Sequence, residues 1–164
     1  ATGGADFDLD AVCIGVTASG KVRNPEDILF YNSPKINGVL TGISESATHS
    51  GDERTGASDG DDETITVDLE KVPAEITKLI FAVTIFEADS RHQNFGQVGN
   101  AKIHVMDAGA DMKDLASYDL SEDMSMGASM IFGEIYRHDG GWKFKAIGMP
   151  KEGGLSALIT EYKA

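Results

Sequence analysis

The sequence predicts an all-β protein, a β-sandwich with short helices and a C-terminal helix. Many short apolar or alternating segments recur between turn residues, which is typical of sandwiches. The clearest hairpin joins residues 129–137 to residues 142–147, around His138-Asp139-Gly140-Gly141. Asp-Gly and Gly-Gly supply the positive φ angles of a tight turn. A chain of 164 residues is expected to form one domain, residues 1–164.

The first quarter of the chain predicts three strands. Residues 11–16 are apolar and β-branched, residues 28–31 form a short apolar run, and residues 39–41 follow a glycine. Residues 32–37 contain a proline and are expected to form a loop. Residues 44–63 are polar and acidic, which indicates a long functional loop.

The middle of the chain predicts a second group of elements. Residues 64–69 alternate as a half-buried strand does, and residues 72–76 suggest a helical turn with a proline in it. Residues 79–86 form a continuous apolar run, expected to be a central strand buried on both faces. Residues 88–97 are polar and are either a loop or a short helix.

The last part of the chain predicts two further strands, the hairpin and a helix. Residues 101–106 alternate, and a strand near residues 115–120 follows a turn. Gly153-Gly154 precedes a final helix. Its apolar side chains lie at helical spacing: Leu155, Leu158, Ile159 and Tyr162.

The charge of the chain limits its partners. The net charge is −13, from 27 acidic and 14 basic residues. A surface this acidic argues against nucleic acid and anionic membranes and favours cations or basic partners. No apolar run reaches the length of a membrane helix, and no signal peptide is visible. The single cysteine, Cys13, is expected to be a buried strand thiol.

Two dense groups of acidic residues suggest a site for a hard divalent cation. In Asp6-Phe7-Asp8-Leu9-Asp10, an extended backbone would bring the three carboxylates to one face. The segment 51–63 has one base, Arg54, and three glycines that allow tight turns. Its six acids are Asp52, Glu53, Asp59, Asp61, Asp62 and Glu63. Clustered carboxylates suit calcium above all, although neither group has the spacing of an EF-hand. A solvated acidic loop without metal is the alternative.

These residues also carry a family resemblance that runs through nearly the whole chain. The chain resembles the TerD family of tellurium-resistance and stress-response proteins. The matching segments are 6–10, 30–32, 51–63, 94–98, 118–123 and 132–138. The resemblance implies a sandwich of two mostly antiparallel sheets that binds calcium, usually at two sites, in the bacterial cytoplasm. It implies association with tellurite and other chemical stress, phage resistance and colicin tolerance, and no established catalytic activity. Other stress-response proteins are expected as partners.

Three departures from the family pattern stand out. The family's first strand, around a Leu-x-Lys-Gly segment, is absent here, so the domain is expected to lack it. Ser58 and Glu53 stand where the family has Gly and commonly Asn. Phe86-Glu87 replaces the usual His-Asp, which leaves Glu87 as a weaker ligand candidate.

The calcium ligands are therefore expected among oxygen donors in three segments. The predicted set is Asp6, Asp8, Asp10, Asn32, Asp52, Asp59, Gly60 through its carbonyl, Asp61, Asp62 and Glu63. Glu122 and Asp123 are weaker candidates. The resemblance assigns none of them a catalytic role.

Two other functions stay open from the sequence. One is a calcium-dependent hydrolase or carbohydrate-binding module, since β-sandwiches host both. The other is an acidic interaction module without metal. The four histidines lack zinc-type spacing and are expected to be ordinary strand or surface residues. Glu134 with Asp119 or Glu122 is a weak candidate for a glycosidase carboxylate pair.

Overall fold

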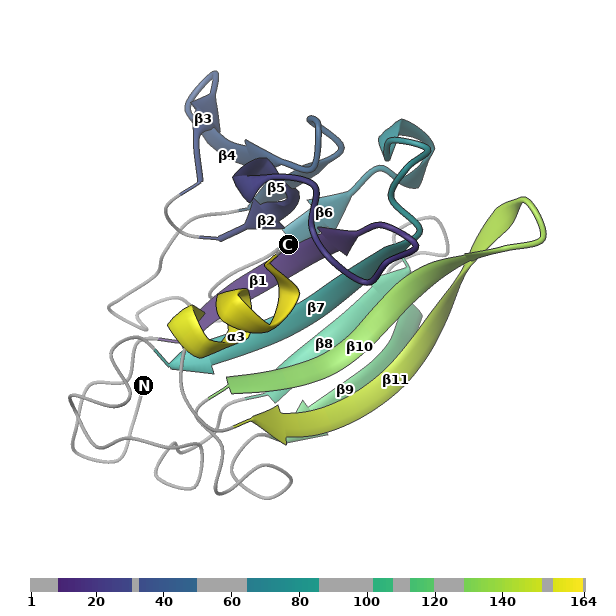
Figure 1. The fold of residues 1–164 in the computed structure, drawn as a ribbon. Coiled ribbons are helices and arrows are strands. Elements are labelled where there is room, and N and C mark those ends of the chain that lie inside the picture. Colours follow the sequence, from purple (N-terminus) through teal and green to yellow (C-terminus); the bar gives the residue numbers. More distant parts are fainter. Residues whose placement is uncertain are drawn as a thin grey trace.

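Five antiparallel strands form the larger of two main sheets (Figure 1). In the computed structural model the order across this sheet is β11-β10-β7-β1-β2, so β11 and β2 are the outermost of its described strands. The strands are β1 (Leu9–Val16), β2 (Ile28–Leu29), β7 (Lys78–Ile85), β10 (Ser129–His138) and β11 (Gly141–Lys151). The structure describes residues 9–30, 33–49, 65–85, 102–107, 113–119, 129–151 and 155–163.

Four short antiparallel strands form the second sheet, in the order β3-β4-β5-β6. They are β3 (Lys35–Ile36), β4 (Val39–Gly42), β5 (Ala47–His49) and β6 (Ile65–Val67). A separate antiparallel pair joins β8 (Lys102–Asp107) to β9 (Lys113–Asp119). The helical elements are the 3-10 turns η1 (Pro25–Asp27) and η2 (Leu69–Lys71) and the C-terminal helix α3 (Leu155–Tyr162).

The two faces of the five-stranded sheet bury two different cores. Cys13 of β1 and Leu79 of β7 pack with Leu40 of β4 and Ala47 of β5, which joins the two sheets into a sandwich. On the opposite face, alternate residues of β1 and β7 pack against Leu158 of α3. Period-2 alternation along each strand produces both cores at once. The predicted all-β sandwich with a C-terminal helix is therefore confirmed.

The strongest sequence signals are also confirmed locally. The β10–β11 turn has φ of 49° at Asp139 and 78° at Gly140, as a type I′ turn requires. The central strand β7 is buried on both faces, because Leu79, Ile80 and Ala82 are all nearly inaccessible. Among the described residues, no helix has the length and apolar character needed to cross a membrane.

Two local predictions are wrong, and a third is incomplete. The loop expected at residues 32–37 contains β3, because Asn37 and Gly38, with φ of 53° and 81°, close a hairpin to β4. The loop expected at residues 44–63 contains β5 (Ala47–His49), which follows a turn. The helical turn expected at residues 72–76 is present as a single turn, closed by a hydrogen bond from the Ile76 amide to the Pro73 oxygen at 3.0 Å. The 3-10 turn η2 before it was not expected, and there the Asp68 carboxylate accepts a hydrogen bond from the Glu70 amide.

Candidate metal centre

Asp10 is the one predicted calcium ligand that lies in the described part of the chain. It is the second residue of β1, and its side chain is 1% exposed. Burial removes a carboxylate from water, which is costly unless the charge is compensated or the group takes up a proton. The other nine predicted ligands, like Glu87, Glu122 and Asp123, lie outside the described residues.

Asp10 belongs to a row of buried polar side chains across the sheet. The strand register places Asp10 opposite Thr84 of β7, and Thr84 opposite Ser129 of β10. Residues directly opposite one another lie on the same face, with Cβ atoms about 5 Å apart. Thr84 and Ser129 are both fully buried. Within the described residues, neither hydroxyl has a hydrogen-bond partner. The row therefore gathers oxygen atoms at one end of the sheet.

The second sheet reaches β1 at Ala11, on the face of the large sheet opposite to that of the Asp10 side chain. His49, the last residue of β5, donates a hydrogen bond from Nε2 to the backbone oxygen of Ala11, at 3.0 Å. His49 also pairs with Ile65, the first described residue of β6. His49 and Ile65, which flank residues 50–64 in the sequence, therefore both lie next to the start of β1. The strand ends that flank the two predicted acidic segments meet at one end of the sandwich.

Other strand ends lie at the same end of the molecule. β2 runs antiparallel to β1, so its C-terminal end, which precedes Asn32 in the sequence, points toward the start of β1. β7 ends at Ile85, opposite Leu9. β10 begins at Ser129, close to the same end of β7. Every predicted ligand segment therefore joins the sandwich at this end.

The described residues supply only part of a metal centre. They contain no group of three or more His, Cys, Asp or Glu side chains that would hold an ion. Asp10, Thr84 and Ser129 offer oxygen alone, which suits a hard cation such as Ca²⁺ and not a soft one. One carboxylate falls short of the six to eight oxygens that calcium takes. Further ligands would have to come from the segments that adjoin this end.

Thr84 and Ser129 belong to the polar row beside Asp10, and the sequence interpretation did not include them. Thr84 is the single polar residue in the run 79–86, and Ser129 opens the apolar run 129–132. A polar residue inside a strand buried on both faces is a signal of an internal site or a ligand. Recognising the row also requires the register of three strands, which are far apart in the sequence.

Three residues to which the sequence assigns no functional role have structural roles. Cys13 is fully buried, and burial raises the pKa of its thiol far above the usual range. His49 is a buried strand histidine that bridges the sheets. The guanidinium carbon of Arg137 lies 4.2 Å from the centroid of the Trp142 ring, and this ring packs against the inter-sheet core.

Comparison with known proteins identifies close relatives. The TerD domain model matches residues 1–162. Tellurium resistance protein TerD of Serratia marcescens is 46% identical over 161 residues, which span 98% of this chain and 80% of the relative. General stress protein 16U of Bacillus subtilis is 46% identical over 160 residues, which span 98% of this chain and 79% of the relative. Chemical-damaging agent resistance protein B of Clostridium acetobutylicum is 44% identical over 141 residues, 86% of this chain and 96% of the relative.

Solved structures share the fold. The crystal structure of a telluride resistance protein homologue from Streptomyces coelicolor A3(2) superposes with a TM-score of 0.76. It covers 94% of this chain and 85% of its own, at 19% identity. A crystal structure of a protein of unknown function has a TM-score of 0.78, at 21% identity, over 97% of this chain and 88% of its own. The match of the family model over nearly the whole length, with relatives at 46% identity, shows that the chain belongs to the TerD family.

Proposed function

We propose that this TerD-family protein is a calcium-binding, non-enzymatic stress-response protein of the cytoplasm. The observation that supports the calcium site most directly is the hydrogen bond from His49 to Ala11, because it brings the ends of the acidic segment 50–64 to the start of β1, the strand that carries Asp10. Two acidic segments distant in the sequence thereby adjoin the same end of the fold. A bound dication would compensate the repulsion between their carboxylates.

Electrostatics favours a cation as the ligand and disfavours an oxyanion. With a net charge of −13, the chain repels tellurite, so direct sequestration of that ion is not part of the proposal. The relatives are named for resistance to tellurium or chemical damage and for stress. We propose that calcium fixes the folded form, which then acts through other stress-response proteins.

Calcium bound by the folded state alone would stabilise it by mass action. An ion concentration a hundred times the Kd adds about 2.7 kcal/mol to the free energy of unfolding. Calorimetric titration of the chelator-treated protein should therefore give saturable heat with Ca²⁺, and its melting temperature should rise with the ion. Mg²⁺ should bind more weakly, because it demands tight octahedral geometry. A melting temperature that does not change in millimolar Ca²⁺ contradicts the proposal.

The variant Asp10→Asn tests the described ligand. With calcium it should lose most of the stabilisation and bind the ion at least tenfold more weakly. Asp139→Asn is the matched control. It removes one carboxylate from an exposed turn where Asn tolerates the positive φ. Equal calcium affinities in the two variants would exclude Asp10 as a ligand.

A further inference from the structure

One face of β11 changes from cationic to apolar along its length. Alternate residues of a strand share a face, and Lys143, Lys145, Ile147 and Met149 form such a series. These four residues are called the β11 stripe below. Lys143 and Lys145 are exposed, Ile147 is half-buried, and Met149 is 47% exposed. The stripe spans about 20 Å, because an extended strand rises about 3.3 Å per residue.

The lysine half of the stripe belongs to a wider area of positive charge. The strand register places Lys143 opposite Tyr136 of β10, and Tyr136 opposite Lys78 of β7, so the three side chains share one face. Strands lie about 4.8 Å apart, so Lys78 and Lys143 are about 10 Å from each other. Glu134, opposite Lys145, contacts Lys78, whose Nζ lies 3.4 Å from its Oε2. Three lysines against one glutamate leave two positive charges on this area.

These positive charges are not neutralised by neighbours in the described structure. Among the described residues, neither Lys143 nor Lys145 forms an ion pair. Lys78 remains 40% exposed despite its contact with Glu134. The lysine half is therefore open to an anionic partner.

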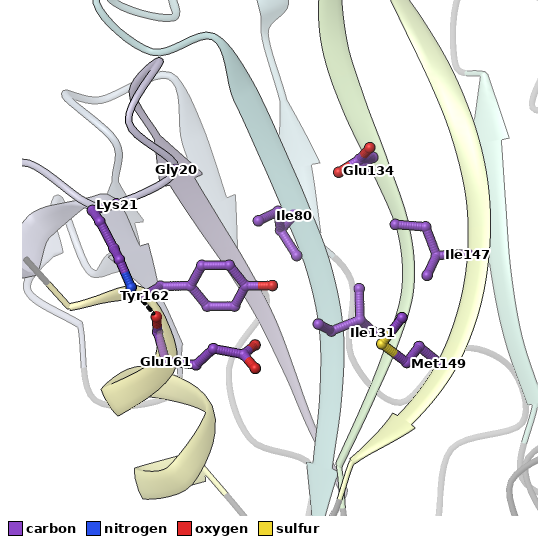
Figure 2. Close-up of a pocket in the computed structure, with 9 residues that line it drawn as sticks. All are labelled: Gly20, Lys21, Ile80, Ile131, Glu134, Ile147, Met149, Glu161 and Tyr162. Atoms are coloured by element: carbon purple, nitrogen blue, oxygen red, sulfur yellow. Dashed lines mark hydrogen bonds between the residues drawn. The ribbon is translucent and has the colours of Figure 1, made fainter.

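The apolar half of the stripe borders a groove of about 420 Å³. Ile147 and Met149 line it from β11, and Ile131 and Ile80 continue the lining on β10 and β7 (Figure 2). Ile147 also packs at the margin of the core that contains Leu158 of α3. Apolar surface that is open to water gains free energy when a partner covers it. The groove therefore suits an apolar side chain.

The lysine half contrasts with the charge of the whole chain. With 27 acidic against 14 basic residues, the chain as a whole repels an acidic partner, which is attracted only where lysines concentrate. Interactions between exposed charges fade over about 8 Å at physiological salt. A short acidic segment can stay within that distance of the lysines. Nucleic acid or an anionic membrane extends beyond them and meets the net negative charge of the chain.

We propose that the β11 stripe binds a short acidic segment of a partner protein. Two carboxylates of this segment would pair with Lys143 and Lys145, and an apolar side chain beside them would enter the groove at Met149. Tyr136, half-buried between Lys143 and Lys78, adds an aromatic ring of the kind enriched in protein interfaces. The segment would lie on the face of the sheet, without pairing to the backbone of β11. Such a docking surface deepens the proposed action through partner proteins, on which it rests, and it requires no calcium.

Calorimetric titration of the whole protein with two synthetic heptapeptides tests the proposal at about 0.15 M salt. One is Glu-Ser-Glu-Ser-Leu-Ser-Leu, and the other has the reversed sequence, because the face does not fix the chain direction. At least one should bind with one-to-one stoichiometry, and the methyl NMR signals of Ile147 and Met149 should shift with the same affinity. Binding with or without Ca²⁺ supports the docking surface even if the calcium site fails. Absence of saturable binding by both peptides at millimolar concentration overturns the proposal.

Three further ligands test the chemistry of the partner at the same salt concentration. The heptapeptide with lysine in place of glutamate should not bind. Polythymidylate and vesicles of phosphatidylserine should bind more weakly than the acidic peptide, since both extend beyond the lysines. Tighter binding of either polyanion would overturn the proposal of a protein partner.

Charge-matched variants distinguish the stripe from general attraction. The double variant Lys143→Gln with Lys145→Gln should weaken binding of the acidic peptide about tenfold, because it removes two ion pairs. Met149→Ser should weaken it several-fold, since less apolar surface is covered. The control Lys35→Gln with Lys71→Gln removes two exposed lysines of β3 and η2 and should leave the affinity unchanged. Equal weakening by the two double variants would mean non-specific attraction and would overturn the proposal.

Discussion

At the scale of single residues, the hydroxyls of Thr84 and Ser129 carry a desolvation cost that the described structure does not offset. A buried hydroxyl without a hydrogen bond costs about 1–3 kcal/mol in folded proteins. Such a cost persists where a group serves a ligand or an ordered water. Thr84 lies between Asp10 and Ser129 in the polar row, so it would respond to anything bound there.

Thr84→Val should raise the free energy of unfolding of the calcium-free protein by about 1 kcal/mol, because a methyl group replaces the uncompensated hydroxyl. Urea denaturation with and without Ca²⁺ measures the change. Thr41→Val is the comparison, since the Thr41 hydroxyl donates to the Val39 backbone oxygen at 2.8 Å and its loss should not stabilise. Destabilisation by Thr84→Val would show that the hydroxyl has a partner in the native protein.

Individual residues also show where sequence interpretation succeeds at the site. Asp10 was predicted because Asp6-Phe7-Asp8-Leu9-Asp10 alternates, and the structure confirms the strand that carries it. The ligand role of Asp10 stays a prediction. Thr84 and Ser129 could not be predicted, because their neighbourhood arises from pairing between strands 45 residues apart in the sequence. Local patterns carry no register information over that range.

At the scale of elements, the β10–β11 hairpin depends on a glycine at its irregular point. The register shifts between Ile131 and Gly133. A Cβ at Gly133 would lie 2.6 Å from the Phe144 ring and 3.1 Å from the Lys145 backbone oxygen. The aromatic ring packs against the glycine because no side chain intervenes.

Gly133→Ala should lower the free energy of unfolding by about 1–3 kcal/mol, because the ring or the strand must move. Gly141→Ala, in the same hairpin, should change it little, since its nearest contact would be the His138 oxygen at 3.8 Å. Thermal unfolding of both variants measures the difference. Equal effects would show that the hairpin tolerates a side chain at the bulge.

The elements differ in how far the sequence predicts them. The hairpin, the central strand β7 and the helix α3 are long and strongly patterned, and all three were predicted. β3 and β5 have two and three residues, too few for periodicity to be recognised. They exist because turns and neighbouring strands hold them. Ile43 is buried and has a φ of 48°. A β-branched residue rarely adopts this backbone conformation, so local sequence preferences do not predict it.

At the scale of the whole molecule, the excess of 27 acidic over 14 basic residues opposes folding through self-repulsion. Sodium chloride should therefore raise the melting temperature of the calcium-free protein between about 0.01 M and 0.3 M, as the Debye length falls from about 30 Å to below 8 Å. The increase should be smaller in saturating Ca²⁺, since bound dications already compensate part of the charge. Differential scanning calorimetry at matched ionic strengths measures both increases. An equal increase with and without calcium would show that the ion leaves the repulsion intact.

The outer position of β11 in the sheet affects how readily the protein aggregates. An eleven-residue outer strand is a template on which other chains can add and grow into fibrils. Lys143 and Lys145 stand exposed along it, and Pro150 withholds a backbone donor near its end. The lysines oppose the docking of a second strand, because their ammonium groups would lose contact with water. The strand that closes the hairpin would therefore also oppose self-association of the sheet.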